Sequence, residues 1–274
     1  MIPFILFFLG LCLGSFVNAW VWRIHKQVQA SSNKQKRRYS ILHGRSMCVH
    51  CSHELAATDL VPVVSWLLLG GKCRYCKGKI SWQYPAVELV GALSFLFSYY
   101  FWPESWSNIN YIFFGLWLVE LVVLLALTVF DIRWRLLPNR MIIILSIPTF
   151  ISLVLTLLSS ANLTLTMLQA FSSIVVGGGI FWVIFQVSSG KWIGGGDVKL
   201  GAVLGLILGS PTLAFMMIFL ASVLGTITAL PLLPSGRPRM KTQLPYGPSL
   251  ILATIVLKLW GASLIAWYRF QTGI

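Results

Sequence analysis

The chain has 274 residues, of which 57% are hydrophobic and 10% are charged, and its mean hydropathy is +0.81. One soluble core could not enclose this much apolar surface, so the composition excludes an ordinary soluble domain and requires long apolar runs to face lipid. The formal net charge of +14 could indicate binding to nucleic acid, but the basic residues are placed as the positive-inside rule places them in membrane proteins. We therefore expect a protein of the lipid bilayer that binds no nucleic acid.

Seven apolar runs are long enough to cross the hydrocarbon layer as helices, which takes about 20 residues. They fall at 3–22, 85–102, 110–130, 139–159, 167–188, 211–233 and 248–268. An eighth run, 198–209, is short and rich in glycine and is followed by Ser210 and Pro211. It is either a full crossing or a broken or re-entrant helix. The sequence predicts an all-α polytopic membrane protein with seven or eight transmembrane helices.

The basic residues predict the orientation of these spans. If 198–209 crosses and the hydrophilic stretch 23–84 is cytoplasmic, every Lys and Arg except Lys258 and Arg269 lies inside. This arrangement puts both termini outside. It puts three basic residues of one late loop inside, namely Arg237, Arg239 and Lys241. The first run has basic residues after it and none before it, so we expect a retained signal-anchor rather than a cleaved signal peptide.

Four cysteines form two C-x-x-C pairs in the stretch 23–84, with 21 residues between the pairs. They are Cys48, Cys51, Cys73 and Cys76. The spacing is close to that of ribbon-type zinc sites, in which four thiolates complete a tetrahedron. Reducing conditions in the cytoplasm disfavour disulfides, and a metal ion can fold a segment that is too small for a core of its own. We expect a structural zinc ion in a small cytoplasmic loop domain.

Two readings compete with this four-cysteine zinc site. His50 and His53 lie close enough in the sequence to replace a cysteine ligand, although histidines inside such knuckles are more often exposed. Alternatively, the four cysteines are unrelated free thiols.

Two of the seven acidic residues, Asp131 and Asp197, adjoin apolar runs on the same predicted face of the bilayer. A carboxylate at the centre of a membrane costs about 2.5–3.5 kcal/mol on insertion scales, and less near the interface, so such residues commonly have a function. Two carboxyl groups that share one proton can perform aspartic proteolysis, in which one activates water and the other polarises the scissile carbonyl. Helix polarity favours the anion of Asp197 at a helix start over that of Asp131 at a helix end, so Asp197 is the expected base and Asp131 the expected acid.

A simpler reading needs no chemistry. Asp197 could cap a helix after Gly194, Gly195 and Gly196, with Asp131 as a solvated residue at the interface. The three glycines could let a substrate backbone approach, or could only connect two helices. Placement alone does not decide between these readings.

Several short motifs follow one another in order along most of the chain. They are Gly14-Ser15-Phe16-Val17-Asn18, Pro62-Val63-Val64-Ser65-Trp66-Leu67 with Gly71-Lys72-Cys73-Arg74-Tyr75-Cys76, Tyr84-Pro85-Ala86-Val87-Glu88-Leu89, Asp131 with Leu137-Pro138-Asn139, and Gly194-Gly195-Gly196-Asp197-Val198-Lys199. This ordered set resembles the prepilin peptidases, the membrane-embedded G-x-G-D aspartic proteases that process type IV pilins and related pseudopilins.

The resemblance implies that Asp131 and Asp197 are the catalytic pair and that the glycines 194–196 form the backbone of the substrate site. It implies a bacterial inner-membrane enzyme whose substrate carries a short basic leader before a hydrophobic helix and is cut after a glycine. Many members of this family also methylate the new N-terminus with S-adenosylmethionine, so methyl transfer is a second expected activity. Glu88 is either part of this machinery or an interfacial residue that pairs with a nearby cation.

We expect three regions: a first transmembrane helix at 1–22, a cytoplasmic loop with the four-cysteine knuckle at 23–84, and a membrane-embedded aspartic peptidase core at 85–274. A zinc-dependent transporter would also combine many spans with a metal knuckle, but it predicts polar residues along the spans. Here the ionisable groups gather at the predicted cytoplasmic ends, with Glu120 and Lys258 as exceptions. A non-catalytic scaffold of a pilus or secretion machine would need neither aspartate.

Overall fold

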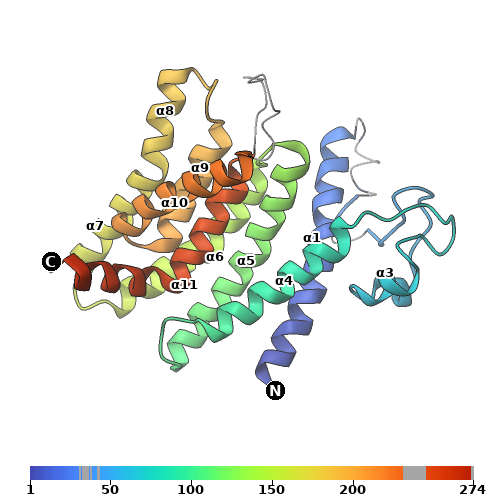
Figure 1. Cartoon of the computed structure of the whole chain (residues 1–274), viewed down its shortest axis with the longest axis horizontal. Coiled ribbons are helices and arrows are strands. Elements are labelled where there is room, and N and C mark those ends of the chain that lie inside the picture. Colours follow the sequence, from blue (N-terminus) through green and yellow to red (C-terminus); the bar gives the residue numbers. More distant parts are fainter. Residues whose placement is uncertain (31, 33–36, 38, 42–43, 231–244, 273–274) are drawn as a thin grey trace. The chain divides into compact units, whose positions relative to one another are not determined.

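The computed structural model describes the chain except for residues 31, 33–36, 38, 42–43, 231–244 and 273–274. The described residues form helices joined by turns and loops, with no β-strand beyond two isolated bridges. They divide into two compact units, Met1–Tyr100 and Phe101–Ile274 (Figure 1). The basic loop cluster predicted from Arg237, Arg239 and Lys241 lies outside the described residues.

The first unit contains α1 (Ile2–Gln29), the short 3₁₀ helix η1 (Ala57–Leu60), α3 (Val64–Leu68) and α4 (Gln83–Tyr100). The second unit contains α5 (Asn108–Trp134), α6 (Asn139–Ser159), α7 (Leu163–Ile174), the π-helical turn η2 (Val175–Gly179), α8 (Ile180–Ser188), α9 (Gly195–Leu208), α10 (Pro211–Ala229) and α11 (Gly247–Thr272).

Six helical segments are long and apolar enough to cross a membrane: α1, α5, α6, the continuous run α7–η2–α8, α10 and α11. This finding confirms the all-α, multi-pass class. Two helices from the expected set of seven or eight fall short among the described residues. In α4 the residues Gln83 and Glu88 lower the hydropathy, and α9 has only 14 residues, about 21 Å at 1.5 Å per residue.

Helices α1 and α4 pack closely against each other in the first unit. A Cβ atom on Gly10 would lie 2.6 Å from the Cα of Ala92, and one on Gly14 would lie 2.7 Å from the Cα of Glu88. Real Cβ atoms do not approach backbone this closely, so both positions need glycine. The small residues of α1 therefore set the distance between the two helices, as small residues do between membrane helices.

Helix α9 packs against α6, α7, η2, α8, α10 and α11 in the second unit (Figure 1). Its face toward η2 is lined by glycine. A Cβ atom on Gly201 would meet the carbonyl oxygen of Gly177, and one on Gly205 would meet the carbonyl oxygen of Ser173. These approaches fix α9 against its neighbours, and α9 carries Asp197 in its first turn.

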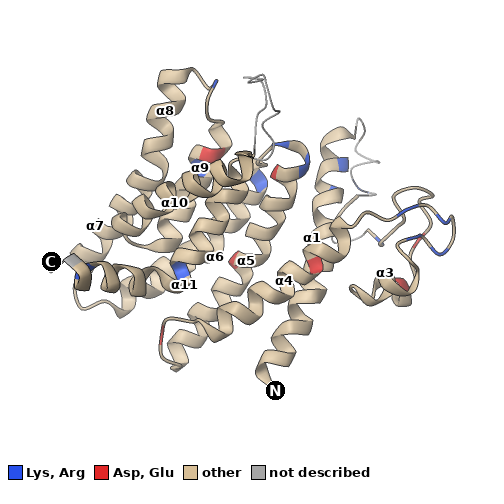
Figure 2. Ribbon diagram, in the orientation of Figure 1, with Lys and Arg blue, Asp and Glu red and all other residues tan. Residues whose placement is uncertain are grey.

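Four helix ends of the second unit gather near the two aspartates. Helix α5 ends where Arg135 adopts the left-handed conformation and donates its backbone N–H to the carbonyl oxygen of Asp131 at 2.8 Å. Three residues later Pro138, which cannot continue a helix, precedes the first residue of α6. Figure 2 shows that charged residues are sparse along the helices of this unit and gather near the ends of α5 and α9.

Candidate active site and metal centre

The four cysteines of the predicted knuckle lie together in the first unit. Their sulfur atoms are all within 4.8 Å of one another, and those of Cys48 and Cys76 are 3.9 Å apart. Zinc–sulfur bonds of about 2.3 Å in a tetrahedron give sulfur–sulfur distances of about 3.8 Å. The cluster therefore has the size and the donor set of a closed metal site.

Neither nearby histidine joins this cluster. The Nε2 atom of His50 lies 3.0 Å from the carbonyl oxygen of Lys79, and the ring of His53 packs on the ring of Tyr75 with centroids 3.8 Å apart. The backbone N–H of His50 instead donates to the sulfur of Cys48 at 3.4 Å. This contact would stabilise a thiolate ligand.

Asp131 lies in the last turn of α5, where its side chain is buried and the residue is 5% exposed. Its Oδ2 atom accepts a 3.1 Å hydrogen bond from the backbone N–H of Gly247, the first residue of α11. A Cβ atom on Gly247 would lie 2.6 Å from the same oxygen. The start of α11 therefore holds the carboxylate, and the positive end of that helix favours its charge.

Asp197 is the third residue of α9, and its Oδ2 atom accepts a 3.3 Å hydrogen bond from the backbone N–H of Gly194. Gly194 occupies the N-cap position, and Asp197, at the third helical position, caps the first turn through this contact, as in a capping box. Burial, and then the negative charge of Asp131, raise the pKa of Asp197 to about 6. Two carboxyl groups that influence each other in this way can share one proton.

Two contacts join the segments around the aspartates. The Nζ atom of Lys199 donates to Oδ1 of Asn139 at 2.9 Å. A Cβ atom on Gly196 would lie 2.9 Å from the Cβ of Leu137. The two motifs that the sequence separates by about 60 residues therefore pack directly on each other.

The three glycines before Asp197 differ in their surroundings. Gly196 packs on Leu137, whereas a Cβ atom on Gly195 would meet nothing nearer than a ring carbon of Phe185 at 3.8 Å. Gly194 lies against the Asp197 carboxyl group, with 3.3 Å between a built Cβ atom and Oδ2. Close helix packing therefore explains Gly196.

The arginines that follow Asp131 do not pair with it. The only ion pairs among the described residues are Arg45–Glu54 and Arg74–Asp59, both in the first unit. The guanidinium of Arg133 lies over the ring of Trp134 at 5.5 Å. The Asp131 carboxylate is thus held by backbone rather than by a cation.

Sequence reasoning missed the segment Tyr246–Gly247, to which it assigned no chemistry. The negative charge of Asp197 acts on the Tyr246 hydroxyl group, which lies 3.1 Å from the hydroxyl of Ser222 on α10. The signal was present: a glycine between Tyr246 and Pro248 at the start of an apolar run is a position where backbone can approach another group closely.

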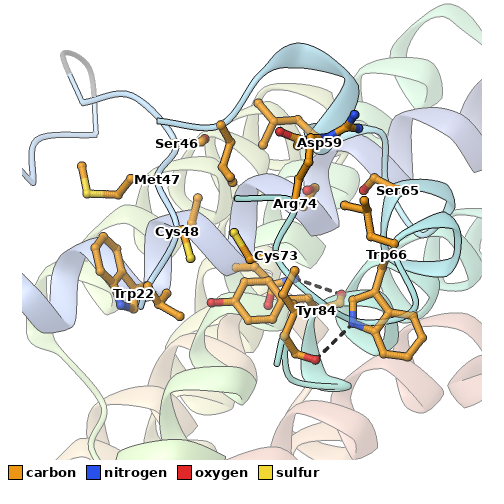
Figure 3. Close-up of a pocket in the computed structure, with 18 of the residues that line it drawn as sticks. Trp22, Ser46, Met47, Cys48, Asp59, Ser65, Trp66, Cys73, Arg74 and Tyr84 are labelled. Carbon is orange, nitrogen blue, oxygen red and sulfur yellow. Dashed lines mark hydrogen bonds and ion pairs between the residues drawn. The ribbon is translucent and has the colours of Figure 1, made fainter. Parts of the chain in front are cut away.

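The remaining motifs meet around a cavity in the first unit (Figure 3). Oε2 of Glu88 accepts a 2.7 Å hydrogen bond from the backbone N–H of Val63, and Ser15 also bonds to this carboxyl group. Asn18 donates to the carbonyl oxygen of Tyr84 at 3.1 Å. The motifs that begin at Gly14, Pro62 and Tyr84 therefore build one site.

The fold and these sites define a multi-pass membrane protein with four cysteines placed to hold a metal ion in one unit and two carboxyl groups near the helix ends of the other. The profile of the Bacterial Peptidase A24 N-terminal domain matches residues 8–102, and that of the Type IV leader peptidase family matches residues 118–230.

Curated relatives agree with these matches. A prepilin leader peptidase/N-methyltransferase of Stutzerimonas stutzeri is 31% identical over 95% of this chain and 91% of its own, and one of Bacillus subtilis is 30% identical over 96% of each. A type 4 prepilin-like proteins leader peptide-processing enzyme of Escherichia coli is 33% identical over 91% of each chain. No solved structure matches the chain. The chain belongs to the type IV leader peptidase family and is an enzyme of that family.

Proposed function

We propose that this enzyme is an aspartic endopeptidase that removes the leader peptide from type IV prepilins or pseudopilins, with Asp131 and Asp197 as its catalytic pair. The observation that carries the proposal is the meeting of the two aspartate motifs, through Lys199–Asn139 and Gly196–Leu137, at one end of the helices. The names of the relatives supply the substrate class. A scaffold or a transporter would not require two carboxyl groups whose charges interact.

The surroundings of the two carboxyl groups favour different roles from those that helix polarity along the chain predicts. Asp131 does end a helix, but it also receives the backbone N–H at the start of α11. The raised pKa of Asp197 favours its protonated form. Both carboxyl groups accept a backbone N–H at a helix start, but the charge of Asp131 also raises the pKa of Asp197, so we assign Asp197 as the acid and Asp131 as the general base.

In this mechanism Asp131 takes a proton from water while the oxygen attacks the scissile carbonyl carbon, and Asp197 gives its proton to the carbonyl oxygen. The tetrahedral intermediate then collapses. The C–N bond breaks, the proton held by Asp131 passes to the leaving amine, and the gem-diol returns a proton to Asp197. The pair therefore ends the cycle with the one proton with which it began.

The orientation proposed here puts the aspartates and the cysteine knuckle on the cytoplasmic side of the bacterial inner membrane and the N-terminus outside. Basic residues near the aspartate end of the second unit support it, since Arg133, Arg135 and Arg140 lie within ten residues of Asp131. The loops expected outside, 103–109 and 160–166, contain no Lys or Arg. A leader in the cytoplasm and a helix in lipid would bring the scissile bond to the depth of the aspartates.

The metal proposed for the knuckle is zinc. Four cysteine sulfurs within 4.8 Å of one another form a donor set that zinc prefers, and a site closed by four protein ligands has a structural role. The ion would hold together the segment between Ser46 and Tyr84, in which only the short helices η1 and α3 are regular.

We further propose that the first unit binds S-adenosylmethionine and methylates the new N-terminus. Its cavity has a volume of about 160 Å³. The rings of Trp22, Trp66 and Tyr84 line it, with the Asp59–Arg74 pair at its rim (Figure 3). Aromatic faces stack with a purine and attract a sulfonium cation, and a carboxylate can accept hydrogen bonds from ribose hydroxyls.

When bound, S-adenosylmethionine would supply a methyl group to the new amine and leave as the neutral thioether, and Trp22, Trp66 and Tyr84 would hold it. The roles of this chain are to bind the donor and to keep bulk water away from it. Buried Cys48 and Cys73 also line the cavity, so the metal centre supports its wall.

The test is to incubate membranes that contain the enzyme with a prepilin reporter and with S-adenosylmethionine carrying a labelled methyl group. The proposal expects a leader-free product with the label on its N-terminal nitrogen. Uncut reporter would contradict the peptidase assignment. Cut but unlabelled product would contradict the methyltransferase assignment alone.

A further inference from the structure

Glu120 and Lys258 are the two ionisable residues that lie far from either end of their apolar helices, and the proposed chemistry uses neither. Glu120 is 3% exposed on α5, and its Oε1 atom accepts a 2.9 Å hydrogen bond from the hydroxyl of Thr149 on α6. Lys258 lies on α11, and its Nζ atom donates to the carbonyl oxygen of Ile207 on α9 at 3.4 Å. A buried charge within a membrane protein calls for a reason.

The two residues lie at the same distance from the aspartate site. Glu120 precedes Asp131 by 11 residues on α5, and Lys258 follows Gly247 by 11 residues on α11. Because Gly247 and Asp131 are in contact, both positions lie about 16 Å from that contact at 1.5 Å per residue. The charge of Lys258 acts on Glu120, although they form no direct ion pair among the described residues.

Helix α9 ends beside Lys258. Its 14 residues give about 21 Å, which is less than the roughly 30 Å of a hydrocarbon layer, so its last carbonyl groups stop inside the protein. The N–H of Gly209, in the left-handed conformation, covers the carbonyl oxygens of Gly205 and Leu206. The ammonium of Lys258 covers the next one, that of Ile207.

A cavity of about 460 Å³ lies beyond this helix end. It is lined by Ile207, Leu208 and Gly209 at the end of α9, by Glu120 and Lys258, and by hydroxyl groups of Thr149, Ser152 and Thr156 along one side of α6. Non-helical backbone at membrane depth is tolerated where it lines a water-filled space. The polar end of the short helix therefore opens on a cavity with polar lining residues, among which Lys258 is the cation.

We propose that Lys258 is a positioning residue for the peptidase: by capping the C-terminus of α9 and balancing Glu120, it holds α9 in the position that sets Asp197 against Asp131. The inference rests on the proposed role of the two aspartates. Lys258 touches neither substrate nor the reacting groups, and it acts through the helix that carries Asp197.

The test compares Lys258→Met, which removes the donor and the charge, with Lys258→Arg, which keeps both. Arg269→Met, at an exposed position of the same helix, controls for the loss of one cation. The first readout is cleavage of a prepilin reporter. We expect Lys258→Met to lower kcat about tenfold or more with KM within twofold, Lys258→Arg to recover most of the rate, and Arg269→Met to match the wild type.

The second readout does not depend on cleavage. Cysteines replace Lys199 and Asn139, whose side chains are in contact, and a short thiol-reactive cross-linker reports the position of α9. We expect cross-linking to fall at least twofold with Lys258→Met and to be unchanged with Lys258→Arg. Normal kcat with Lys258→Met, or a lowered kcat with unchanged cross-linking, would overturn the inference.

The cross-linking also separates this inference from the proposed function, because it would respond to Lys258 even if the aspartates were not catalytic. If Lys258→Met fails to accumulate in membranes, Lys258→Ala replaces it, since alanine also removes the donor and the charge. Reporter cleavage and cross-linking are then measured on that variant, with the same expected and contradicting results.

Discussion

The backbone N–H of Gly247 donates a 3.1 Å hydrogen bond to Oδ2 of Asp131, so the carboxylate in the last turn of α5 lies at the first residue of α11. This contact spans 116 residues of sequence. It gives Asp131 a fixed donor and leaves no room for a side chain at position 247, since a Cβ atom there would lie 2.6 Å from the same oxygen.

Gly247→Ala is therefore expected to displace either the Asp131 carboxylate or the start of α11. A displacement of about 1 Å at a reacting group can lower the rate about 100-fold, and we expect a loss of this order in kcat for cleavage of a prepilin reporter, with normal accumulation in the membrane. Gly225→Ala is the control, because a Cβ atom there would meet nothing nearer than 3.6 Å in the same region. Equal activity of both variants would show that the contact does not matter.

Gly196→Ala is expected to disturb the packing of the two aspartate motifs. The added methyl group would lie 2.9 Å from the Cβ of Leu137, which cannot move without its backbone, and such overpacking typically costs 1–3 kcal/mol. Thermal inactivation and cleavage rate measure the effect. Gly195→Ala, with 3.8 Å to its nearest neighbour, should retain both properties, and a comparable loss there would mean that the glycines serve the substrate instead.

Cys73→Ser is expected to remove zinc from the knuckle. Cys73 is 2% exposed and belongs to the four-sulfur cluster. Because metal binding is worth about 10–16 kcal/mol in zinc-finger peptides, a segment of this size is expected to unfold without it. Metal analysis should find about one zinc per wild-type chain and little in the variant, and limited proteolysis should cut the variant between Ser46 and Tyr84. Cys12→Ser, outside the cluster on α1, should resemble the wild type.

Glu88→Ala is expected to weaken binding of S-adenosylmethionine about tenfold or more. The Glu88 carboxylate accepts the N–H of Val63, which has a φ of 60°, a strained value for a β-branched residue that needs support from its surroundings. Without this hydrogen bond, the backbone of the segment that carries Ser65 and Trp66 should shift, and the cavity wall should change shape. Equilibrium binding to membranes with labelled S-adenosylmethionine checks this.

Glu54→Ala is the matched control for Glu88→Ala, because Glu54 pairs with Arg45 at an exposed position and such pairs contribute little. Unchanged binding in Glu88→Ala would remove the cavity from the methyltransferase proposal. A loss of equal size in both variants would point to a general effect of charge.

Much of this architecture follows from local sequence signals. The cysteine spacing predicted the four-cysteine cluster, and the apolar runs predicted the helices of both units. The position of Asp131 near a helix end and of Asp197 near a helix start was also predicted, because glycines and apolar runs mark those boundaries.

The contacts between distant helices could not be predicted in the same way. The hydrogen bond from Gly247 to Asp131 depends on tertiary packing, and an apolar helix start contains little that identifies its partner. The same holds for the packing of α1 on α4, which depends on Gly10 and Gly14 facing one particular backbone. Glu120 and Lys258 stood out as exceptions in charge placement, but their relation to the end of α9 appears only when the helices are in place.

The most direct test of the account is cleavage of a prepilin reporter in membranes by the wild type, Asp131→Asn and Asp197→Asn. Asparagine keeps the size and the acceptor oxygen that bonds to Gly247 or Gly194, so both variants should insert normally. The account predicts that each accumulates to wild-type levels and that neither cuts. Cleavage at the wild-type rate by either variant would contradict the aspartic pair and would favour the scaffold or transporter readings.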